Sequence, residues 1–213
     1  MTAIVRLTRV STSFGTGGDA VLTDVSFAIE PGQKASLVGV SGSGKSTILS
    51  LIAGLLRPDA GIVELDGVSL AGLDDAALAR LRSRRIGIAL QSDNLIPFLS
   101  AQENVELAQS FGPGKPNGGQ ARALLDRMGV AHRAAHLPRQ MSGGEAQRVS
   151  LANAPALLLA DEMVAQLDHD TAEAVVGDVF DSDMAVLFVT HDPVLAARAD
   201  LRLGVQGKSV VVQ

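Results

Sequence analysis

Residues 39–47, with the sequence GVSGSGKST, constrain the fold of this chain more than any other segment. They match G-x-x-x-x-G-K-[ST], the pattern of a phosphate-binding loop. The apolar run 35–38 before the loop predicts a strand, and the run 48–53 after it predicts a helix that Gly54 ends. A flexible Gly/Ser linker has no need of Lys and Ser at a fixed offset between a strand and a helix. The segment therefore predicts a strand–loop–helix unit that binds nucleotide phosphates.

The chemistry of the predicted loop follows from its residue types. Glycines let backbone N–H groups approach phosphate oxygens, where a Cβ would obstruct them, and the helix N-terminus adds partial positive charge. We expect Lys45 to reach the β- and γ-phosphates and Ser46 to ligate Mg²⁺. The predicted nucleotide-binding residues of the loop are Gly39, Ser41, Gly42, Ser43, Gly44, Lys45, Ser46 and Thr47.

Composition narrows the class of protein. A chain of 213 residues with 46% apolar residues suits one large domain, or a core with an inserted subdomain. The net charge is −5, and the arginine-rich run 80–85 is expected on a solvated helix face, so no nucleic-acid partner is predicted. The absence of cysteine excludes disulfides. No apolar stretch approaches the ~18 residues of a membrane span, so we expect any membrane role to need a partner.

Hydrophobic periodicity predicts an α/β fold. The expected elements are strands at 3–10, 21–29, 34–38, 62–65, 86–90, 157–160 and 185–189, and helices at 74–85, 120–128, 171–180 and 193–199, with a surface loop at 112–119. Alternation of strands and helices implies a mainly parallel sheet with crossover helices. We therefore expect a nucleotide-binding core of residues 1–91 and 156–213, interrupted by a helical subdomain of residues 92–155.

Two carboxylates end one of the predicted buried strands. The apolar run 157–160 leads directly into Asp161 and Glu162. Sites in parallel sheets form at the carboxyl ends of strands, so this pair is expected beside the phosphate loop. Asp161 then suits Mg²⁺ coordination, and Glu162 suits the general base that orients and deprotonates the attacking water. Two acidic residues at a solvated strand end are common, but the upstream phosphate loop favours the functional interpretation.

A second signal is the segment 141–145, MSGGE, which is followed by AQRV. A serine and two glycines at a helix start supply another set of N–H donors. The phosphate loop, Gln91, this segment, the Asp161-Glu162 strand and the Thr190-His191-Asp192 triplet occur in the order found in the ATPase subunits of ABC transporters. The chain resembles that family over nearly its whole length. Residues 86–105 are most similar to the exporter branch of macrolide-efflux and lipoprotein-releasing ATPases.

The resemblance implies both an architecture and an assembly. Its fold would be a P-loop NTPase core with a mainly parallel sheet, an N-terminal antiparallel β portion and an inserted helical subdomain. Two subunits, either two copies or this chain and a homologous ATPase subunit, would enclose two ATP molecules head to tail. Ser142, Gly143 and Gly144 of one subunit would then contact the γ-phosphate held by Lys45 of the other. An integral-membrane permease would hold the cytoplasmic pair at the inner face of the membrane.

Further residue roles follow from the same resemblance. Gln91 would sense Mg²⁺ and the attacking water at the hinge to the helical subdomain. His191 would contact the γ-phosphate, although a lone histidine at a strand end is often only a polar surface residue. Phe14 would stack on adenine, with a core phenylalanine as the alternative. Asp168 would lie in a loop that crosses the dimer interface.

The sequence departs from the family pattern at two places. The loop 163–168 reads MVAQLD, without the proline and glycine of the family's Pro-Thr-Gly-Asn-Leu-Asp-like loop. The helix after residues 142–145 is also shorter than the family's by about four residues, or about one turn. The altered loop is expected to change communication between the two ATP sites. The shorter helix is expected to reposition either the start of the helix at residues 142–144 or the strand that carries Glu162, which puts full hydrolytic competence in question.

The leading expectation is an ATP-binding and ATP-hydrolysing subunit that powers a separate permease, with export implied by the branch. A non-transport ATPase regulator of the division type is one alternative. The other is a nucleotide-binding subunit with weakened hydrolysis, which the two departures motivate. A neighbouring permease gene would separate the first alternative from the leading expectation, and the Mg²⁺-dependent ATPase of the isolated protein would separate the second.

Overall fold

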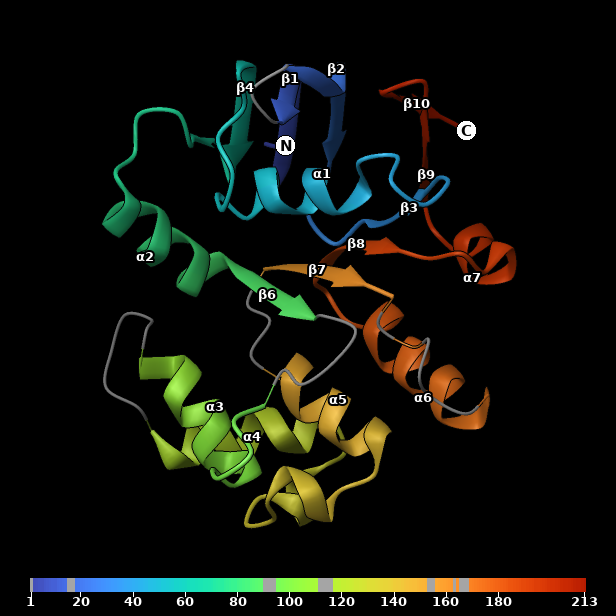
Figure 1. The fold of residues 1–213 in the computed structure, drawn as a ribbon. Helices are drawn as coiled ribbons and strands as arrows, with labels where there is room; N and C mark the ends of the chain where they lie inside the picture. The colour runs from blue at the N-terminus through green and yellow to red at the C-terminus, as the bar shows by residue number, and fades with distance from the viewer. Residues whose placement is uncertain are drawn as a thin grey trace.

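A computed structural model describes residues 2–14, 18–89, 95–110, 117–152, 156–162, 164 and 169–213. The described chain forms two β-sheets and a layer of helices (Figure 1). The antiparallel sheet runs in the order β2 (Asp19–Ile29), β1 (Val5–Phe14), β4 (Ala60–Leu65) and β5 (Val68–Ser69). The second sheet runs β10 (Ser209–Val212), β9 (Leu201–Gln206), β3 (Lys34–Val38), β8 (Ala185–Val189), β7 (Leu157–Asp161) and β6 (Ile86–Ala89). All of its neighbouring strands are parallel except β10 and β9.

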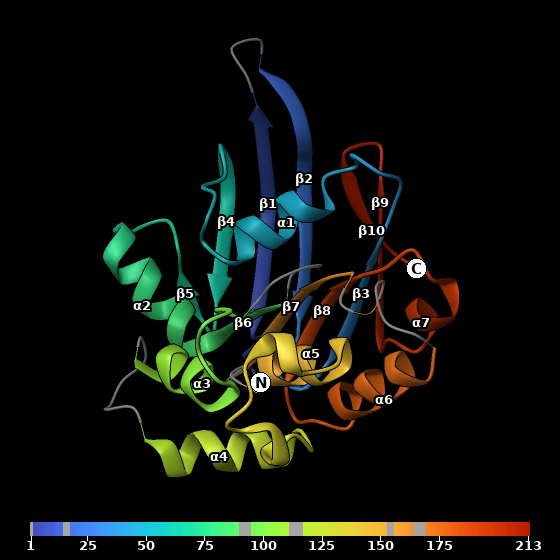
Figure 2. The same cartoon turned by 60° about the horizontal axis from the view of Figure 1, so that its bottom comes forward.

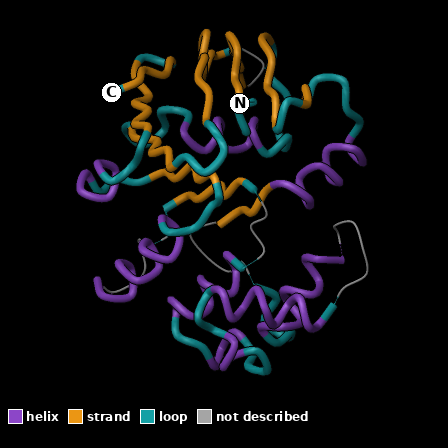
Figure 3. The backbone as a smooth tube through the Cα atoms, turned by 180° about the vertical axis from the view of Figure 1, so that it is seen from behind, coloured by secondary structure: helices purple, strands orange, loops and turns teal. Residues whose placement is uncertain are grey.

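Helices cover the parallel sheet on both faces. The α-helices are α1 (Lys45–Ile52), α2 (Asp75–Arg85), α3 (Ala101–Ser110), α4 (Gly118–Arg127), α5 (Gly143–Leu151), α6 (His169–Phe180) and α7 (Pro193–Ala197), and the 3₁₀ helices are η1 (Ala131–Arg133) and η2 (Pro138–Gln140). Helix α1 lies between the two sheets, whereas α3, α4 and α5 form the separate layer (Figures 1 and 2). The view from behind shows the same separation of strands and helical layer (Figure 3). No helix of the described ranges is long and apolar enough to cross a membrane.

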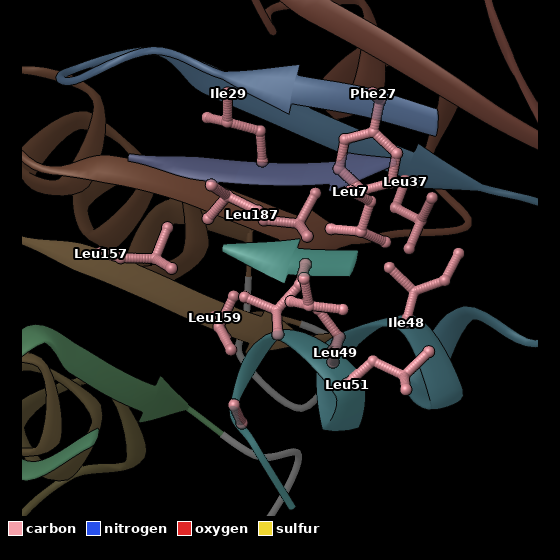
Figure 4. Close-up of a cluster of buried hydrophobic side chains, with 14 of the residues drawn as sticks. Leu7, Phe27, Ile29, Leu37, Ile48, Leu49, Leu51, Leu157, Leu159 and Leu187 are labelled. Carbon is pink, nitrogen blue, oxygen red and sulfur yellow. The ribbon is translucent and has the colours of Figure 1, made fainter. Parts of the chain in front are cut away.

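The first four residues of β7 are all apolar because they are buried on both faces of the sheet. Leu157 and Leu159 join the core shared with α1 and the antiparallel sheet, whereas Leu158 and Ala160 join the core shared with the helical layer. Successive side chains of a strand point to opposite faces, so a strand buried on both faces needs an unbroken apolar run. In the first core, Leu49 and Leu51 of α1 lie among leucines of the parallel strands (Figure 4).

A buried lysine anchors the start of β3, at the end opposite the phosphate loop. Lys34 is 5% exposed, and its Nζ donates to the carbonyl oxygens of Gly32, Ser182 and Met184. Burial lowers the pKa of Lys34, and the nearby carboxylates of Asp200 and Asp183 act in the opposite direction. The lysine thereby ties the turn before β3 to the turn before β8.

The predicted fold class is confirmed: an α/β cassette with an N-terminal antiparallel sheet, a mainly parallel core sheet and a helical layer. The predicted bounds of β3 and β8 agree with the structure. The predicted loop 112–119 is wrong at its end, since α4 begins at Gly118 and the side chain of Asn117 accepts from the Gly119 N–H. Sequence periodicity also missed the β9–β10 hairpin, where Gly207 and Lys208 turn the chain at positive φ.

Candidate nucleotide-binding site

Three neighbouring parallel strands end at the same level of the sheet. Leu37 of β3 pairs with Val189 of β8, and Val189 pairs in turn with Asp161 of β7. The phosphate loop, the His191 segment and Glu162 each follow directly from one of these strand ends. The register therefore brings three segments that are distant in sequence to one edge, where parallel α/β sheets form their sites.

The backbone of the phosphate loop requires two of its glycines. Gly42 and Gly44 have φ values of 75° and 104°, in the left-handed region that favours glycine. A Cβ on Gly44 would also stand 2.9 Å from Leu22 Cδ2. Gly44 is the N-cap of α1, and no described side chain caps the helix. The first N–H groups of α1 are thus left for an anionic ligand.

Lys45 and Ser43 are polar groups that face into the loop. Lys45 is 8% exposed, and its Nζ donates to the carbonyl oxygens of Gly39 at 2.8 Å and Val40 at 2.9 Å. The buried Ser43 Oγ has no hydrogen-bond partner among the described residues. A buried hydroxyl without a partner is costly, and a phosphate oxygen would satisfy it. The loop therefore suits a phosphate group by charge and by hydrogen bonding.

Ser46 and Asp161 form the part of the site that suits a metal ion. Ser46 Oγ donates to Asp161 Oδ2 at 3.0 Å. The described residues hold no group of three or more His, Cys, Asp or Glu that would bind a metal by themselves. Mg²⁺ ordinarily takes one or two protein oxygens and completes its shell with phosphate and water. The pair therefore fits Mg²⁺ bound together with a nucleotide.

Glu162 and His191 meet at the ends of β7 and β8. Glu162 Oε1 lies 3.2 Å from His191 Nε2, and the Glu162 N–H donates to the carbonyl oxygen of Val189 at 3.1 Å. Glu162 has a φ of 51°, a left-handed conformation that costs a non-glycine residue about 1–3 kcal/mol. This conformation turns the chain out of β7 and directs the carboxylate toward His191.

Phe14, the predicted adenine-stacking residue, ends β1. Phe14 is 48% exposed, which excludes the alternative of a core phenylalanine. Asp59 fixes this end of the strand, because its Oδ2 accepts from the Ser13 N–H at 2.7 Å and from Ser13 Oγ at 2.6 Å. Sequence reasoning missed Asp59, which belongs to none of the motifs.

Residues 142–144 begin α5 in the helical layer, apart from the phosphate loop of the same chain (Figures 1 and 2). Ser142 and Gly143 are exposed, whereas Gly144 is buried where α5 passes α6. A Cβ on Gly144 would collide with Thr171 Cγ2, so this glycine serves helix packing. One chain therefore does not bring these three residues to its own Lys45.

Some predicted features lie outside the described residues. They are Gln91 and its neighbours 90–94, residues 112–116 of the predicted surface loop, Asp168, the rest of the altered loop except Val164, and residues 153–155. Sequence reasoning also missed a capping box, in which Glu145 accepts from the Ser142 N–H at 2.8 Å and donates its own N–H to Ser142 Oγ at 3.2 Å. The S-x-x-E spacing at the start of a helix could have revealed it.

Comparison with known sequences matches this chain to ATP-binding proteins of ABC transporters. The family model for ABC transporters matches residues 22–165. The chain is 42% identical over 210 residues to the lipoprotein-releasing system ATP-binding protein LolD 1 of Rhodospirillum rubrum, covering 93% of each. It is 41% identical over 212 residues to the uncharacterized ABC transporter ATP-binding protein YbbA of Escherichia coli K12, covering 92% of each. The macrolide export ATP-binding/permease protein MacB of Salmonella typhimurium is 37% identical over 222 residues, which cover 99% of this chain and 34% of MacB.

A solved structure with a similar fold was determined with ligands. It is the dimeric post-hydrolysis state of the ATP-binding cassette MJ0796, bound to ADP and Pi. The TM-score is 0.85 at 33% sequence identity, and the match covers 98% of this chain and 97% of that one.

Proposed function

Because the chain belongs to the ABC transporter family, as an ATP-binding ATPase subunit, we propose that it hydrolyses Mg-ATP within a head-to-tail pair of cassettes and so drives a separate permease. One observation carries the proposal. The aligned ends of β3, β8 and β7 bring Lys45, His191 and Glu162 to one edge of the sheet. The three side chains supply a phosphate-binding cation, a γ-phosphate contact and a general base.

Phosphate binding would exchange contacts within the loop for contacts to ATP. Lys45 Nζ, which donates to two loop carbonyl oxygens, would turn to the β- and γ-phosphate oxygens. These charge-assisted hydrogen bonds are stronger than those to neutral carbonyls. Ser43 Oγ and the N–H groups of α1 would complete the cradle.

Ser46 and Asp161 would hold Mg²⁺, with Gln91 as a further ligand. The ion, when bound, neutralises charge on the β- and γ-phosphates. Glu162 would accept the proton of the attacking water. His191, in contact with Glu162 Oε1, would orient that carboxylate and donate to the γ-phosphate.

A second cassette would complete each ATP site. Ser142 and Gly143 are exposed at the start of α5, away from the phosphate loop of their own chain. Across a head-to-tail interface they would meet the γ-phosphate held by the other subunit, with Asp168 at that interface and Phe14 on the adenine. ATP would then stabilise the pair by mass action, and hydrolysis would release it.

The permease would dock on the surface of residues 91–104, on the inner face of a membrane. Phe98 in this segment is 76% exposed. LolD 1 and MacB, by their names, serve lipoprotein release and macrolide export, which favours an export permease. The transported substrate would be recognised by the permease.

The test is a pair of measurements on the isolated protein. Mg²⁺-dependent ATP hydrolysis is expected, together with an ATP-induced dimer that accumulates in Glu162→Gln because this variant binds but barely turns over. Lys45→Ala, which removes the phosphate-binding cation, is the matched negative control. Binding of ATP without hydrolysis by the natural protein would favour the alternative of a nucleotide-binding subunit with weakened hydrolysis. Turnover in Glu162→Gln equal to that of the natural protein would refute the assignment of the base.

A further inference from the structure

We propose that Arg133 is a positioning residue for the ATP site: by pairing with Glu145, it fixes the start of α5 in the form that meets the γ-phosphate of the second cassette. Arg133 is the last residue of η1, and α5 begins at Gly143. The arginine would not contact the nucleotide itself. This inference rests on the head-to-tail function proposed above.

Each oxygen of the Glu145 carboxylate accepts a hydrogen bond from a different donor. Oε2 accepts from the Ser142 N–H at 2.8 Å, and Oε1 accepts from Arg133 Nε at 2.8 Å. The Glu145 side chain is only 13% exposed, and its pKa is lowered to about 2, first by the Ser142 N–H and then by Arg133. The carboxylate is therefore charged and fixed from both sides.

Arg133 lies in a segment that hydrogen bonds fix to the rest of the helical layer. Its Nη1 lies 3.4 Å from His136 Nε2, and because a guanidinium only donates, this contact is a hydrogen bond when that nitrogen is an unprotonated acceptor. The same short segment is fixed to the start of α3, since the N–H groups of Ala101 and Gln102 donate to the carbonyl oxygens of His136 and Ala134. Arg133 thus holds Glu145 from a fixed support. His132 also approaches Glu145 Oε1, at 3.4 Å, but its side chain is 60% exposed.

The pairing matters for two physical reasons. A carboxylate three residues from a phosphate-binding serine would repel the phosphate, and the adjacent guanidinium offsets this charge. The closed capping box also makes Ser142 Oγ an acceptor for the Glu145 N–H. The hydroxyl keeps its own hydrogen as a donor, which faces the Glu145 carboxylate in this form and would turn to a phosphate oxygen when one binds. Without Arg133, both the charge balance and the cap would weaken.

The experiment measures ATP-induced dimerisation by sedimentation in the Glu162→Gln protein with saturating Mg-ATP. Adding Arg133→Met, which keeps the apolar stem, should raise the protein concentration at half-dimerisation about fivefold or more, the change expected when a helix cap is weakened at each site. Arg133→Lys should restore part of the loss. Binding of a fluorescent ATP analogue to the monomer should stay within about twofold, because the phosphate loop lies on another element. Arg127→Met, at an exposed arginine in the same layer, is the matched control and should behave as the parent.

A double substitution separates positioning from mere support of the fold. Glu145→Gln keeps an acceptor for the Ser142 N–H but carries no charge, so Arg133→Met should have less than about a twofold effect in that background. An equal effect of Arg133→Met with and without Glu145→Gln would overturn the inference, as would a dimer unchanged by Arg133→Met. Should Arg133→Met fail to fold, the dimerisation of Arg133→Lys and Glu145→Gln decides, since unchanged values in both would also refute it.

The proposed function and this inference fail in different ways. If the Glu162→Gln parent never dimerises with ATP, the head-to-tail function is wrong. The contact itself is then tested by ¹³C NMR titration of Glu145, whose pKa should rise from about 2 when Arg133 is replaced by Met. An unchanged Glu145 pKa would show that Arg133 does not hold this carboxylate.

Discussion

Ser46 Oγ donates a 3.0 Å hydrogen bond to Asp161 Oδ2, although 115 positions separate the two residues in sequence. The bond joins the first turn of α1 to the end of β7. It sets two of the protein oxygens of the proposed metal site side by side before any ion binds. A preformed pair needs little reorganisation when Mg-ATP arrives.

Replacing Asp161 by Ala should weaken the use of Mg²⁺ rather than the binding of nucleotide. We expect the Mg²⁺ concentration for half-maximal ATPase to rise about 10- to 100-fold, since one oxygen that orients the metal site is lost. Binding of ATP in the presence of EDTA should not change, because Lys45 and the loop remain. An unaltered Mg²⁺ requirement would remove Asp161 from the metal site.

His191→Ala should lower turnover by about 10²- to 10³-fold, the range found when one donor to a developing charge is removed. The residue lies 3.2 Å from Glu162, just after β8, whereas Lys45 and the phosphate loop belong to other elements. Loss of its single contact to the γ-phosphate should therefore change the affinity for ATP, measured by equilibrium dialysis, much less than the turnover. Full turnover in His191→Ala would show that His191 is only a polar surface residue.

The charge on Glu145 gives a defined pH dependence. Its folded pKa of about 2 lies below the ordinary value of 4.5, so its contribution to the free energy of unfolding is present above pH 4.5 and is lost as the pH falls toward 2. Denaturant unfolding should thus show the full difference between the natural protein and Glu145→Gln at pH 5.5. The difference should shrink below about pH 4. A difference that stays constant from pH 5.5 down to pH 3 would contradict a lowered pKa.

Lys34→Met should lower the free energy of unfolding by about 1–3 kcal/mol. The methionine can fill the same space, but three carbonyl oxygens lose their donor. Lys208→Met, at the exposed β9–β10 turn, is the matched control and should change stability by less than about 0.5 kcal/mol. Because Lys34 lies at the far end of β3, ATP binding should survive in the folded variant. Equal stability of the two variants would show that the buried ammonium does not stabilise the turn.

Asp59→Ala should weaken ATP binding several-fold by releasing the strand end that carries Phe14. Asp59→Asn retains an acceptor oxygen and should restore most of the affinity. In a Phe14→Ala background, the Asp59→Ala substitution should add little, since both act on the same adenine contact. Additive losses in affinity would mean that Asp59 acts elsewhere.

Much of the site could be predicted because its parts are local. The phosphate loop needs left-handed glycines next to a Lys-Ser pair, and β7 needs an apolar run that ends in carboxylates, so each leaves a recognisable pattern. The strand 185–189 has the predicted bounds because it is buried on both faces and apolar throughout. The strand 34–38 keeps its predicted bounds although it contains Lys34 and Ser36, because both buried side chains donate to backbone carbonyl oxygens. The β9–β10 hairpin was not predicted because β9 contains arginine and glycine and β10 has only four residues, so the sheet that they join decides their conformation.

The sequence by itself predicted which residues bear the chemistry and which predicted strand or helix lies next to each of them. Only the tertiary structure decided which of these residues meet. The pairs Ser46–Asp161, Glu162–His191 and Arg133–Glu145 depend on strand register, on a left-handed residue at a strand end and on a 3₁₀ turn beside a helix start. The physical reason is range: conformational preferences act between near neighbours in the chain, whereas these contacts exist only once two cores have packed against the same parallel sheet.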